Sequence, residues 1–211
     1  MKPASSESFH FATLLMVSKW TSDWPGPSMF ESLLQRIAIA CERAGLPYMI
    51  IGGQAVLRYG EPRLTKDIDV SLGLDLDRLP EAQALVDGLG LTPLVDPQVF
   101  TRQTLVLPCL EPETGIRVDL ILAFSPYEQE ALLRARPAKL GTAEVRFASP
   151  EDLIVHKIIA ARPRDLDDVR SVLARNPGLD FQYIRQWLRE FAQALDQPVL
   201  ERFDAIATEG R

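Results

Sequence analysis

The sequence predicts an α+β fold in which a mixed β-sheet is flanked by helices and followed by a C-terminal helical bundle. Up to about residue 148, short apolar or alternating runs typical of strands recur between helical segments. Over about the last 60 residues, apolar residues follow helical spacing throughout. The length of 211 residues, of which 46% are hydrophobic, suits one good-sized domain with a smaller appendage.

We divide the chain into three parts. Residues 1–28 form an N-terminal extension of uncertain order, 29–148 a core of mixed strands and helices and 149–211 a C-terminal helical region. The extension is Ser-rich and then carries Trp20 and Trp24, which we interpret as packing residues. It fits a tail, an arm packed on the domain, or a segment ahead of a start at Met29, and these alternatives stay open.

The first half of the core is predicted to alternate helices with strands. Apolar periodicity and a terminal glycine define the first helix, and an apolar run that ends at Gly52-Gly53 defines the first strand. The next strand alternates polar with apolar residues, so one of its faces carries carboxylates. The predicted elements are a helix over 29–45, a strand over 48–51, a helix over 54–59, a strand over 67–72 and a helix over 79–89.

Turn residues and helix caps divide the second half. Pro108 and a turn at 111–115 separate two strands, and Ser149 caps a helix whose first residue is Pro150. The predicted elements are strands over 104–107 and 117–122, a helix over 125–136, a strand over 145–147, and helices from 150 through 157, over 164–175 and over 181–195.

Two carboxylates two residues apart, Asp67 and Asp69, are the first candidate site residues. In a strand they share one face, within reach of one cation, and paired carboxylates suit Mg²⁺. A solvent-facing acidic edge is the alternative, but the hydrophobic Ile68 and Val70 between them indicate that the other face is buried. Asp119, in the apolar run 117–122, is costly to bury unless paired or metal-bound, and it would complete a metal site on an adjacent strand.

Gly52 and Gly53 lie between a buried strand and a short helix. Glycines there allow close backbone approach, and free N–H groups at a helix start favour a phosphate. A tight turn without a ligand is the alternative for this pair taken alone.

Together, these residues resemble the nucleotidyltransferase superfamily of the DNA polymerase β type. Its signature joins a hydrophobic residue with Gly-Gly or Gly-Ser, a spacer, Asp-x-Asp on a strand and a later Asp on a neighbouring strand. Here Ile51-Gly52-Gly53 is followed by Asp67-Ile68-Asp69 and then by Asp119. The resemblance implies an enzyme that moves a nucleoside monophosphate from an NTP to an acceptor, with two Mg²⁺ ions held by the three aspartates.

The segment Arg63-Leu-Thr65-Lys66-Asp67-Ile-Asp69 narrows the resemblance to the AbiEii/AbiGii-like group of toxin nucleotidyltransferases. Ser149–Lys157 and the following Arg164–Asp168 are also similar to that group. The resemblance implies that Lys157 binds the nucleotide phosphates, supported by Asp165 or, as the competing choice, Asp168. It also implies triphosphate binding by Arg63, Thr65 and Lys66, for which stiffening of the turn is the alternative.

The bulk properties bound the function. A net charge of −6 and a pI of about 5.0 disfavour a broad nucleic-acid-binding surface, so RNA contact is expected from local clusters. Two cysteines without zinc-ligand spacing indicate free thiols, and no apolar run is long enough to span a bilayer. We therefore expect a cytoplasmic protein without membrane contact. The expected local clusters are Arg134, Arg136 and Lys139, and Arg162 with Arg164.

Three functions remain open at this level. The first is a toxin–antitoxin component that modifies RNA, such as the tRNA acceptor end, and has a cognate antitoxin. The second is a nucleotidyltransferase acting on a small molecule of the aminoglycoside or lincosamide type. The third is a protein-AMPylating or non-catalytic antitoxin-like partner. The sequence leaves open which NTP is used.

Overall fold

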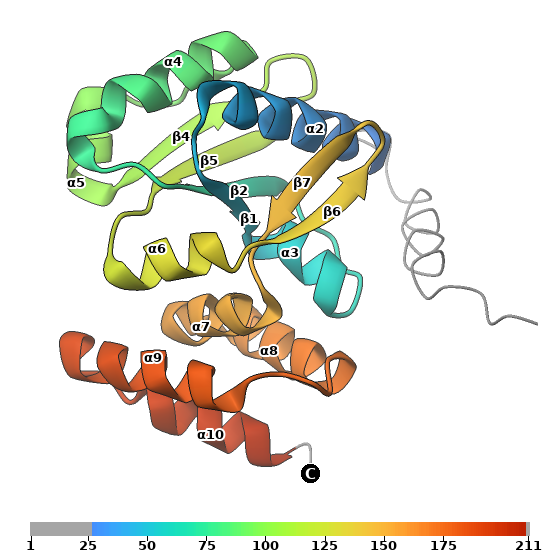
Figure 1. The fold of residues 1–211 in the computed structure, drawn as a ribbon, viewed down its shortest axis with the longest axis vertical. Helices are drawn as coiled ribbons and strands as arrows, with labels where there is room; N and C mark the ends of the chain where they lie inside the picture. The colour runs from blue at the N-terminus through green and yellow to red at the C-terminus, as the bar shows by residue number, and fades with distance from the viewer. Residues whose placement is uncertain (1–26, 210–211) are drawn as a thin grey trace, which may run out of the picture.

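A mixed sheet forms the centre of the computed structural model, which describes residues 27–209 (Figure 1). Its strands within these residues are β1 (Tyr48–Ile51), β2 (Asp67–Leu72), β3 (Thr92–Pro93), β4 (Val106–Leu110), β5 (Arg117–Leu122), β6 (Arg136–Leu140) and β7 (Ala143–Phe147). They lie in the order β3-β4-β5-β2-β1-β7-β6. β2 pairs with β5 in parallel and β1 with β7 in parallel, and the other neighbours are antiparallel. The predicted α+β class with a mixed sheet is confirmed.

Helices cover the sheet on both sides. Their bounds are α2 (Pro27–Ala44), α3 (Gly52–Tyr59), α4 (Leu79–Leu89), α5 (Arg102–Thr104), α6 (Pro126–Leu133), α7 (Pro150–Ala160), α8 (Pro163–Arg175), α9 (Phe181–Leu195) and α10 (Val199–Glu209), with a 3₁₀ turn at Leu76–Arg78 and a π-helical turn at Pro97–Thr101. In Figure 1, α2 and α4 lie along one side of the sheet, and α7 to α10 stack as a bundle on the other. α3 contacts both β2 and the bundle helices α7 and α8, so it joins the two layers.

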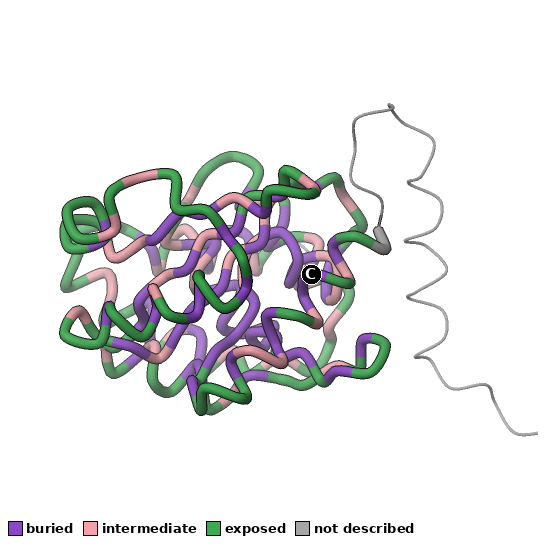
Figure 2. The backbone as a smooth tube through the Cα atoms, turned by 90° about the horizontal axis from the view of Figure 1, so that it is seen from above, coloured by how far each residue is buried: buried purple, intermediate pink, exposed green. Residues whose placement is uncertain are grey.

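The two faces of the central strands differ in burial. Alternation in β2 and β5 sends one set of side chains into the core and the other to a half-open face. Figure 2 shows the buried segments in the interior and the exposed ones around them. The fully buried set comprises Ile68, Val70, Leu72, Val118, Leu120 and Leu122, and the half-open face carries Asp67, Asp69, Arg117 and Asp119.

The strand predicted at 104–107 is wrong in its bounds. Thr104 ends the short helix α5, and Leu105, at φ +62°, turns the chain before β4 starts at Val106. β4 then runs through Pro108, which was predicted to separate two strands. The carbonyl of Pro108 accepts a hydrogen bond from the backbone N–H of Leu94, so the backbone polar groups of Pro108 face the short strand β3. The missing N–H of the proline therefore costs little, because β3 is short and offers few hydrogen bonds there.

The helix predicted over 125–136 begins after Ser125, which caps it, and ends earlier than predicted, at Leu133. Arg136 instead opens β6, which pairs with β7 through a turn at Gly141, whose φ is +52°. The segment Arg136–Leu140 contains a proline and a lysine and has a weak strand signal, so pairing with β7 decides its conformation. Lysine and proline on this outermost strand of the described sheet also discourage edge-to-edge association.

The remaining predictions fall close to the observed bounds. The strands over 48–51, 67–72 and 117–122 and the helices over 79–89 and 181–195 have the predicted ends, and Ser149 caps α7. The short strands at β3 and β6 and the separate helix α10 were not predicted as individual elements. Trp20 and Trp24 lie outside the described residues. Among the described helices, none combines the length and the apolar character that a bilayer crossing requires.

Candidate active site

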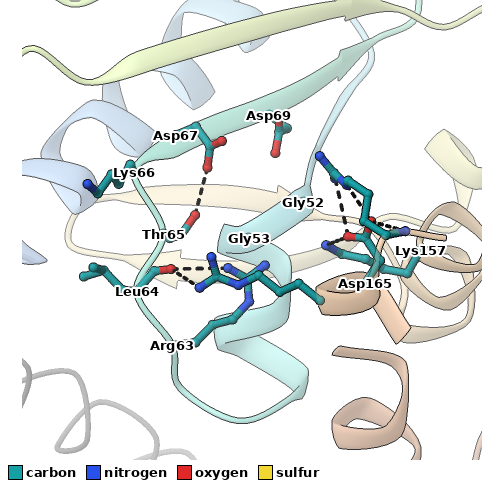
Figure 3. A pocket seen from close by; sticks show the side chains of 12 residues that line it. Gly52, Gly53, Arg63, Leu64, Thr65, Lys66, Asp67, Asp69, Lys157 and Asp165 are labelled. Atoms are coloured by element: carbon teal, nitrogen blue, oxygen red, sulfur yellow. Dashed lines mark hydrogen bonds and ion pairs between the residues drawn. The ribbon is translucent and has the colours of Figure 1, made fainter. Parts of the chain in front are cut away.

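A pocket of about 390 Å³ opens where β2, α3 and the loop 60–66 meet α7 and α8 (Figure 3). The carboxylates of β2 lie on one side of it, and Lys157 and Asp165 lie on the other. Nine residues singled out from the sequence line the pocket: Gly52, Gly53, Arg63, Thr65, Lys66, Asp67, Asp69, Lys157 and Asp165. Leu64, Arg162 and Arg164 complete the lining.

The two β2 carboxylates differ in their partners. Thr65 donates its hydroxyl to Asp67 Oδ1 at 2.9 Å, which orients that carboxylate toward the pocket. Within residues 27–209, no hydrogen bond to the Asp69 carboxylate is formed. Burial, and then the charges of Asp67 and Asp119, raise the pKa of Asp69 from 3.8 to about 6, although Lys157 and Arg162 oppose this shift. Lys157 and Arg162 therefore compensate the negative charge of Asp69 only in part.

Gly52 and Gly53 bring the backbone against these side chains. Gly52 has φ +60° at the start of α3, in the left-handed region that favours glycine. A Cβ atom on Gly52 would overlap the Asp69 carboxylate, and one on Gly53 would overlap the Thr65 hydroxyl. The two glycines thus let the start of α3 and the Asp-x-Asp segment lie in direct contact.

Asp119 lies beside Asp69 but is turned to another partner. The parallel register pairs Asp69 with Asp119 and Asp67 with Arg117. The Asp119 carboxylate accepts from Arg117 Nε at 2.8 Å and does not line the pocket. Over the described part of the chain, no three acidic, histidine or cysteine side chains are arranged as a metal-binding group. The backbone therefore brings the three aspartates together, whereas the side chain of the third is engaged elsewhere.

Lys157 projects from α7 into a buried ion-pair cluster. Its ammonium lies 2.7 Å from Asp165 Oδ1 and 2.8 Å from Asp168 Oδ2, and all three side chains are less than 10% exposed. Arg162 also pairs with Asp165, at 2.7 Å. Burial would raise the pKa of Asp165, but hydrogen bonds from Arg162 and Lys157 outweigh it and lower the pKa. Asp165 and Asp168, which the sequence presented as competing partners of Lys157, both contact it.

The loop 60–66 is held onto α8 by polar contacts. Arg63 binds Asp168 through two hydrogen bonds, of 2.7 and 2.9 Å. Arg164 donates to the carbonyl of Leu64 at 2.7 Å, and the backbone N–H of Glu61 donates to the hydroxyl of Ser171. Asp168 thereby joins Arg63 to Lys157, and the loop that leads into Asp67 is fixed relative to α7 and α8.

The pocket is positively charged although the chain is acidic. Its lining has five basic side chains and three carboxylates, whereas the whole chain has a net charge of −6. The basic residues are Arg63, Lys66, Lys157, Arg162 and Arg164. Cations lining a concave site attract anionic ligands and concentrate the field there. The lining suits a polyphosphate with a divalent cation.

The β2 carboxylates fit a divalent cation. Both offer hard oxygen ligands, the charge of Asp69 is only partly compensated, and Mg²⁺ in nucleotide sites is commonly held by one or two carboxylates together with substrate phosphates. Asp119, whose Oδ1 accepts from Arg117, does not line the pocket, so it could join them only if its carboxylate turns toward the pocket.

Several aromatic and basic residues outside the pocket have structural partners. His156 stacks edge-on against Tyr127, and burial lowers its pKa. Trp187 also packs against Tyr127. Arg134 and Arg136, expected as an RNA-contacting cluster with Lys139, instead form ion pairs with Glu151, and Arg134 also pairs with Asp152.

Arg162, Arg164 and Leu64 were not predicted as pocket residues. The two arginines had been noted only as a basic cluster. In the sequence, Arg162 and Arg164 lie close to Asp165, and Leu64 follows Arg63. This nearness to predicted site residues was the one feature that could have indicated them as pocket residues.

Comparison with known protein families identifies the chain. Residues 33–210 match the family described as nucleotidyl transferase AbiEii toxin of type IV toxin–antitoxin systems. The chain belongs to this family. The AbiEii-type chain is thus a member of a nucleotidyltransferase family. No curated protein matches its sequence closely enough to count as a relative.

Solved structures share the fold of this AbiEii-type chain. The solution structure of the antibiotic-resistance factor ANT(2″)-Ia matches with a TM-score of 0.56 and 21% identity, covering 80% of this chain and 96% of that one. The crystal structure of ANT(2″)-Ia with adenylyl-2″-tobramycin matches with a TM-score of 0.54 and 21% identity, covering 80% of this chain and 99% of that one. The crystal structure of an antigenic nucleotidyltransferase-like protein from Paracoccidioides brasiliensis matches with a TM-score of 0.53 and 16% identity, covering 85% of this chain and 94% of that one. At these identities the likeness concerns the fold alone.

Proposed function

We propose that the chain transfers a nucleoside monophosphate from an NTP to the acceptor end of an RNA, with tRNA as the expected class. The observation that carries this proposal is the pocket that Asp67 and Asp69 line together with five basic side chains. Figure 3 shows the carboxylates on one side of it and Lys157 on the other. Such a pocket accommodates the triphosphate and its cation together. Membership in the AbiEii toxin family supports the reaction type and a cognate antitoxin as partner.

In this proposal the residues divide the work of phosphoryl transfer. Asp67 and Asp69 hold Mg²⁺ ions, which when bound neutralise the triphosphate and activate the acceptor hydroxyl. Asp119, once its carboxylate has turned from Arg117 toward the pocket, accepts the proton of that hydroxyl. The hydroxyl oxygen attacks the α-phosphorus, and the bond from the α-phosphorus to the leaving pyrophosphate breaks. Lys157, Arg63 and Arg162 stabilise the charge on the pyrophosphate.

RNA is favoured as the acceptor class by the mouth of the pocket. Lys66, Arg162 and Arg164 are all exposed there, and the side chain of Arg162 is 76% exposed. Exposed cations beyond the buried Lys157 provide contacts for a phosphodiester backbone next to the reacting end. The acidic remainder of the chain limits such contacts to this region.

The test offers α-³²P-labelled NTPs to total RNA, total protein and a panel of aminoglycosides and lincosamides. We expect label at RNA ends with wild-type protein and none with Asp69→Asn. Asp87→Asn, on the exposed surface of α4, makes the same charge change and should keep full transfer. Label only in a small molecule or only in protein would refute the RNA proposal and identify the acceptor class.

A further inference from the structure

Arg117 is a basic residue in the midst of the candidate metal ligands, and the proposed reaction assigns it no part. In the paired strands β2 and β5, alternate residues form a square on the half-open face: Asp67 beside Arg117 and Asp69 beside Asp119. Arg117 is the sole basic residue of these two strands. Neighbouring strands lie about 4.8 Å apart, so the four charges interact strongly.

The guanidinium is bound to the third carboxylate. Arg117 Nε donates to Asp119 Oδ1 at 2.8 Å, and the Asp119 side chain is only 16% exposed. This hydrogen bond, and then the charges of Asp119, Asp67 and Asp69, raise the pKa of Arg117, so its positive charge is permanent. The basic side chains that line the pocket belong to the loop 60–66, α7 and the start of α8. Arg117 is therefore a separate cation, on the β5 side of the carboxylates.

We infer that Arg117 is a positioning residue that holds Asp119 away from the metal site until a divalent cation displaces it. Arg117 occupies Oδ1 of Asp119 and offsets part of its negative charge, so a divalent cation that binds Asp119 competes with the guanidinium for this carboxylate. The pairing explains why, within residues 27–209, the three aspartates form no metal-binding group although the register places them side by side. Asp67 and Asp69 would take the first ion with the nucleotide, and Asp119 would become available afterwards.

The guanidinium has room to move once it is displaced. The Arg117 side chain is 53% exposed, so it can swing into solvent without leaving a buried charge unpaired. Arg117 thus makes the metal site weak in the free protein and complete only when the nucleotide brings its cation. This inference rests on the proposed metal-dependent function and concerns the order in which its carboxylates are used.

The test measures Mn²⁺ binding in the absence of nucleotide, by electron paramagnetic resonance of free Mn²⁺. Arg117→Gln should bind Mn²⁺ about fivefold to tenfold more tightly than the wild type, because it frees Asp119 and removes a nearby positive charge. A merely structural arginine would leave affinity unchanged or weaken it. Arg117→Lys, which keeps the charge, should stay within about threefold of wild type.

Two further variants distinguish the role of Arg117 from the existence of the metal site. Arg78→Gln removes an arginine of similar exposure from its ion pair with Glu81 on another element, and should not change the affinity. Asp69→Asn should abolish Mn²⁺ binding. If Arg117→Gln binds no tighter than wild type while Asp69→Asn still abolishes binding, the role of Arg117 is refuted and the metal site stands. If the wild type binds no Mn²⁺ even with a non-hydrolysable NTP, both the metal site and the role of Arg117 are refuted.

Discussion

Two groups of acidic residues in this molecule differ in how completely the protein itself satisfies them. Asp152, at the start of α7, is fully buried and accepts from Ser149, Tyr183 and Arg134. Its neighbour Glu151 accepts from Arg134, Arg136 and the backbone N–H of residue 180. On β2, in contrast, Asp69 accepts no hydrogen bond from the described residues and has a raised pKa.

The difference separates a structural role from a binding role. Through their hydrogen bonds, Glu151 and Asp152 join the end of α6, the start of β6 and helix α9. Each of their carboxylate oxygens already accepts at least one hydrogen bond from the protein. The β2 acids are half-buried, repel each other and face a pocket. Buried or half-buried carboxylates that the fold leaves without partners are costly, and a bound cation would remove that cost. Acidity alone does not distinguish the two groups, whereas their hydrogen bonds do.

The largest effect is expected from Asp69→Asn on activity. If the partly compensated charge binds the catalytic cation, its removal should lower transfer of label from an α-³²P NTP by at least about 10³-fold. Far-UV circular dichroism should be unchanged, because no hydrogen bond from the described protein is lost. Wild-type rates in this variant would contradict a binding role for the β2 acids.

Asp152→Ala should produce the opposite pattern, a loss of stability without a loss of chemistry. Removing the carboxylate leaves the Tyr183 and Ser149 hydroxyls without their acceptor and takes from Arg134 one of its two carboxylate partners. We expect a cost of about 3 kcal/mol in urea unfolding. Transfer per folded molecule should stay within about twofold of wild type. Asp167→Ala, which removes an exposed acid, is the control and should cost less than about 0.5 kcal/mol.

The stability of metal-free protein should depend on pH through Asp69. Its folded pKa of about 6 exceeds the ordinary 3.8, so the folded state retains a proton that the unfolded state has lost between these values. The associated stability is fully present below pH 3.8 and is lost as the pH rises through 6. Asp69→Asn, which cannot ionise, should therefore be more stable than wild type at pH 7.5.

We expect that gain to be about 1–2 kcal/mol, below the limit of about 3 kcal/mol that a shift of this size allows, because the side chain is partly exposed. The difference should disappear near pH 4. Urea unfolding in EDTA at both pH values measures it, and Mg²⁺ should narrow the gap at pH 7.5 by stabilising only the wild type. Equal stability of the two proteins at pH 7.5 would show that Asp69 is already compensated.

Tyr183→Phe should give a small change, a loss of about 1 kcal/mol of stability, with transfer unaffected. The substitution removes the 2.7 Å hydrogen bond to Asp152 Oδ1, while Ser149 and Arg134 continue to donate to Asp152 Oδ2. Tyr127→Phe, which loses a longer bond of 3.3 Å to the Asp152 carbonyl, should cost less. A loss of 3 kcal/mol or more in Tyr183→Phe would mean that the α7 acids depend on a single partner.

Local pattern accounts for much of the fold. Alternation or apolar runs placed β1, β2 and β5 at their observed ends, and the cap at Ser149 placed the start of α7. β6 escaped prediction because its conformation depends on pairing with β7, which lies later in the chain. β4 was displaced because a proline normally argues against a strand, and only its position beside the short β3 makes it tolerable.

The sequence predicted most of the residues of the candidate site, but not the hydrogen bonds and ion pairs between them. Spacing placed Asp67 and Asp69 on one face, and family resemblance supplied Lys157 and Asp165. The contact of Asp168 with both Lys157 and Arg63 joins residues about a hundred positions apart, through a loop whose course no local pattern specifies. Likewise, the pairing of Arg117 with Asp119 depends on side-chain rotamers.

The contact of Gly52 with Asp69 and of Gly53 with Thr65 has a genetic consequence. Every missense change at these two codons adds at least a Cβ atom and displaces a side chain of the proposed site. In a selection for cells that survive expression of the protein, suppressor alleles should therefore fall at codons 52 and 53 as often as at codons 67 and 69. Alleles at the aspartates remove charge, whereas alleles at the glycines deform the pocket, and survivors of both kinds should accumulate folded protein.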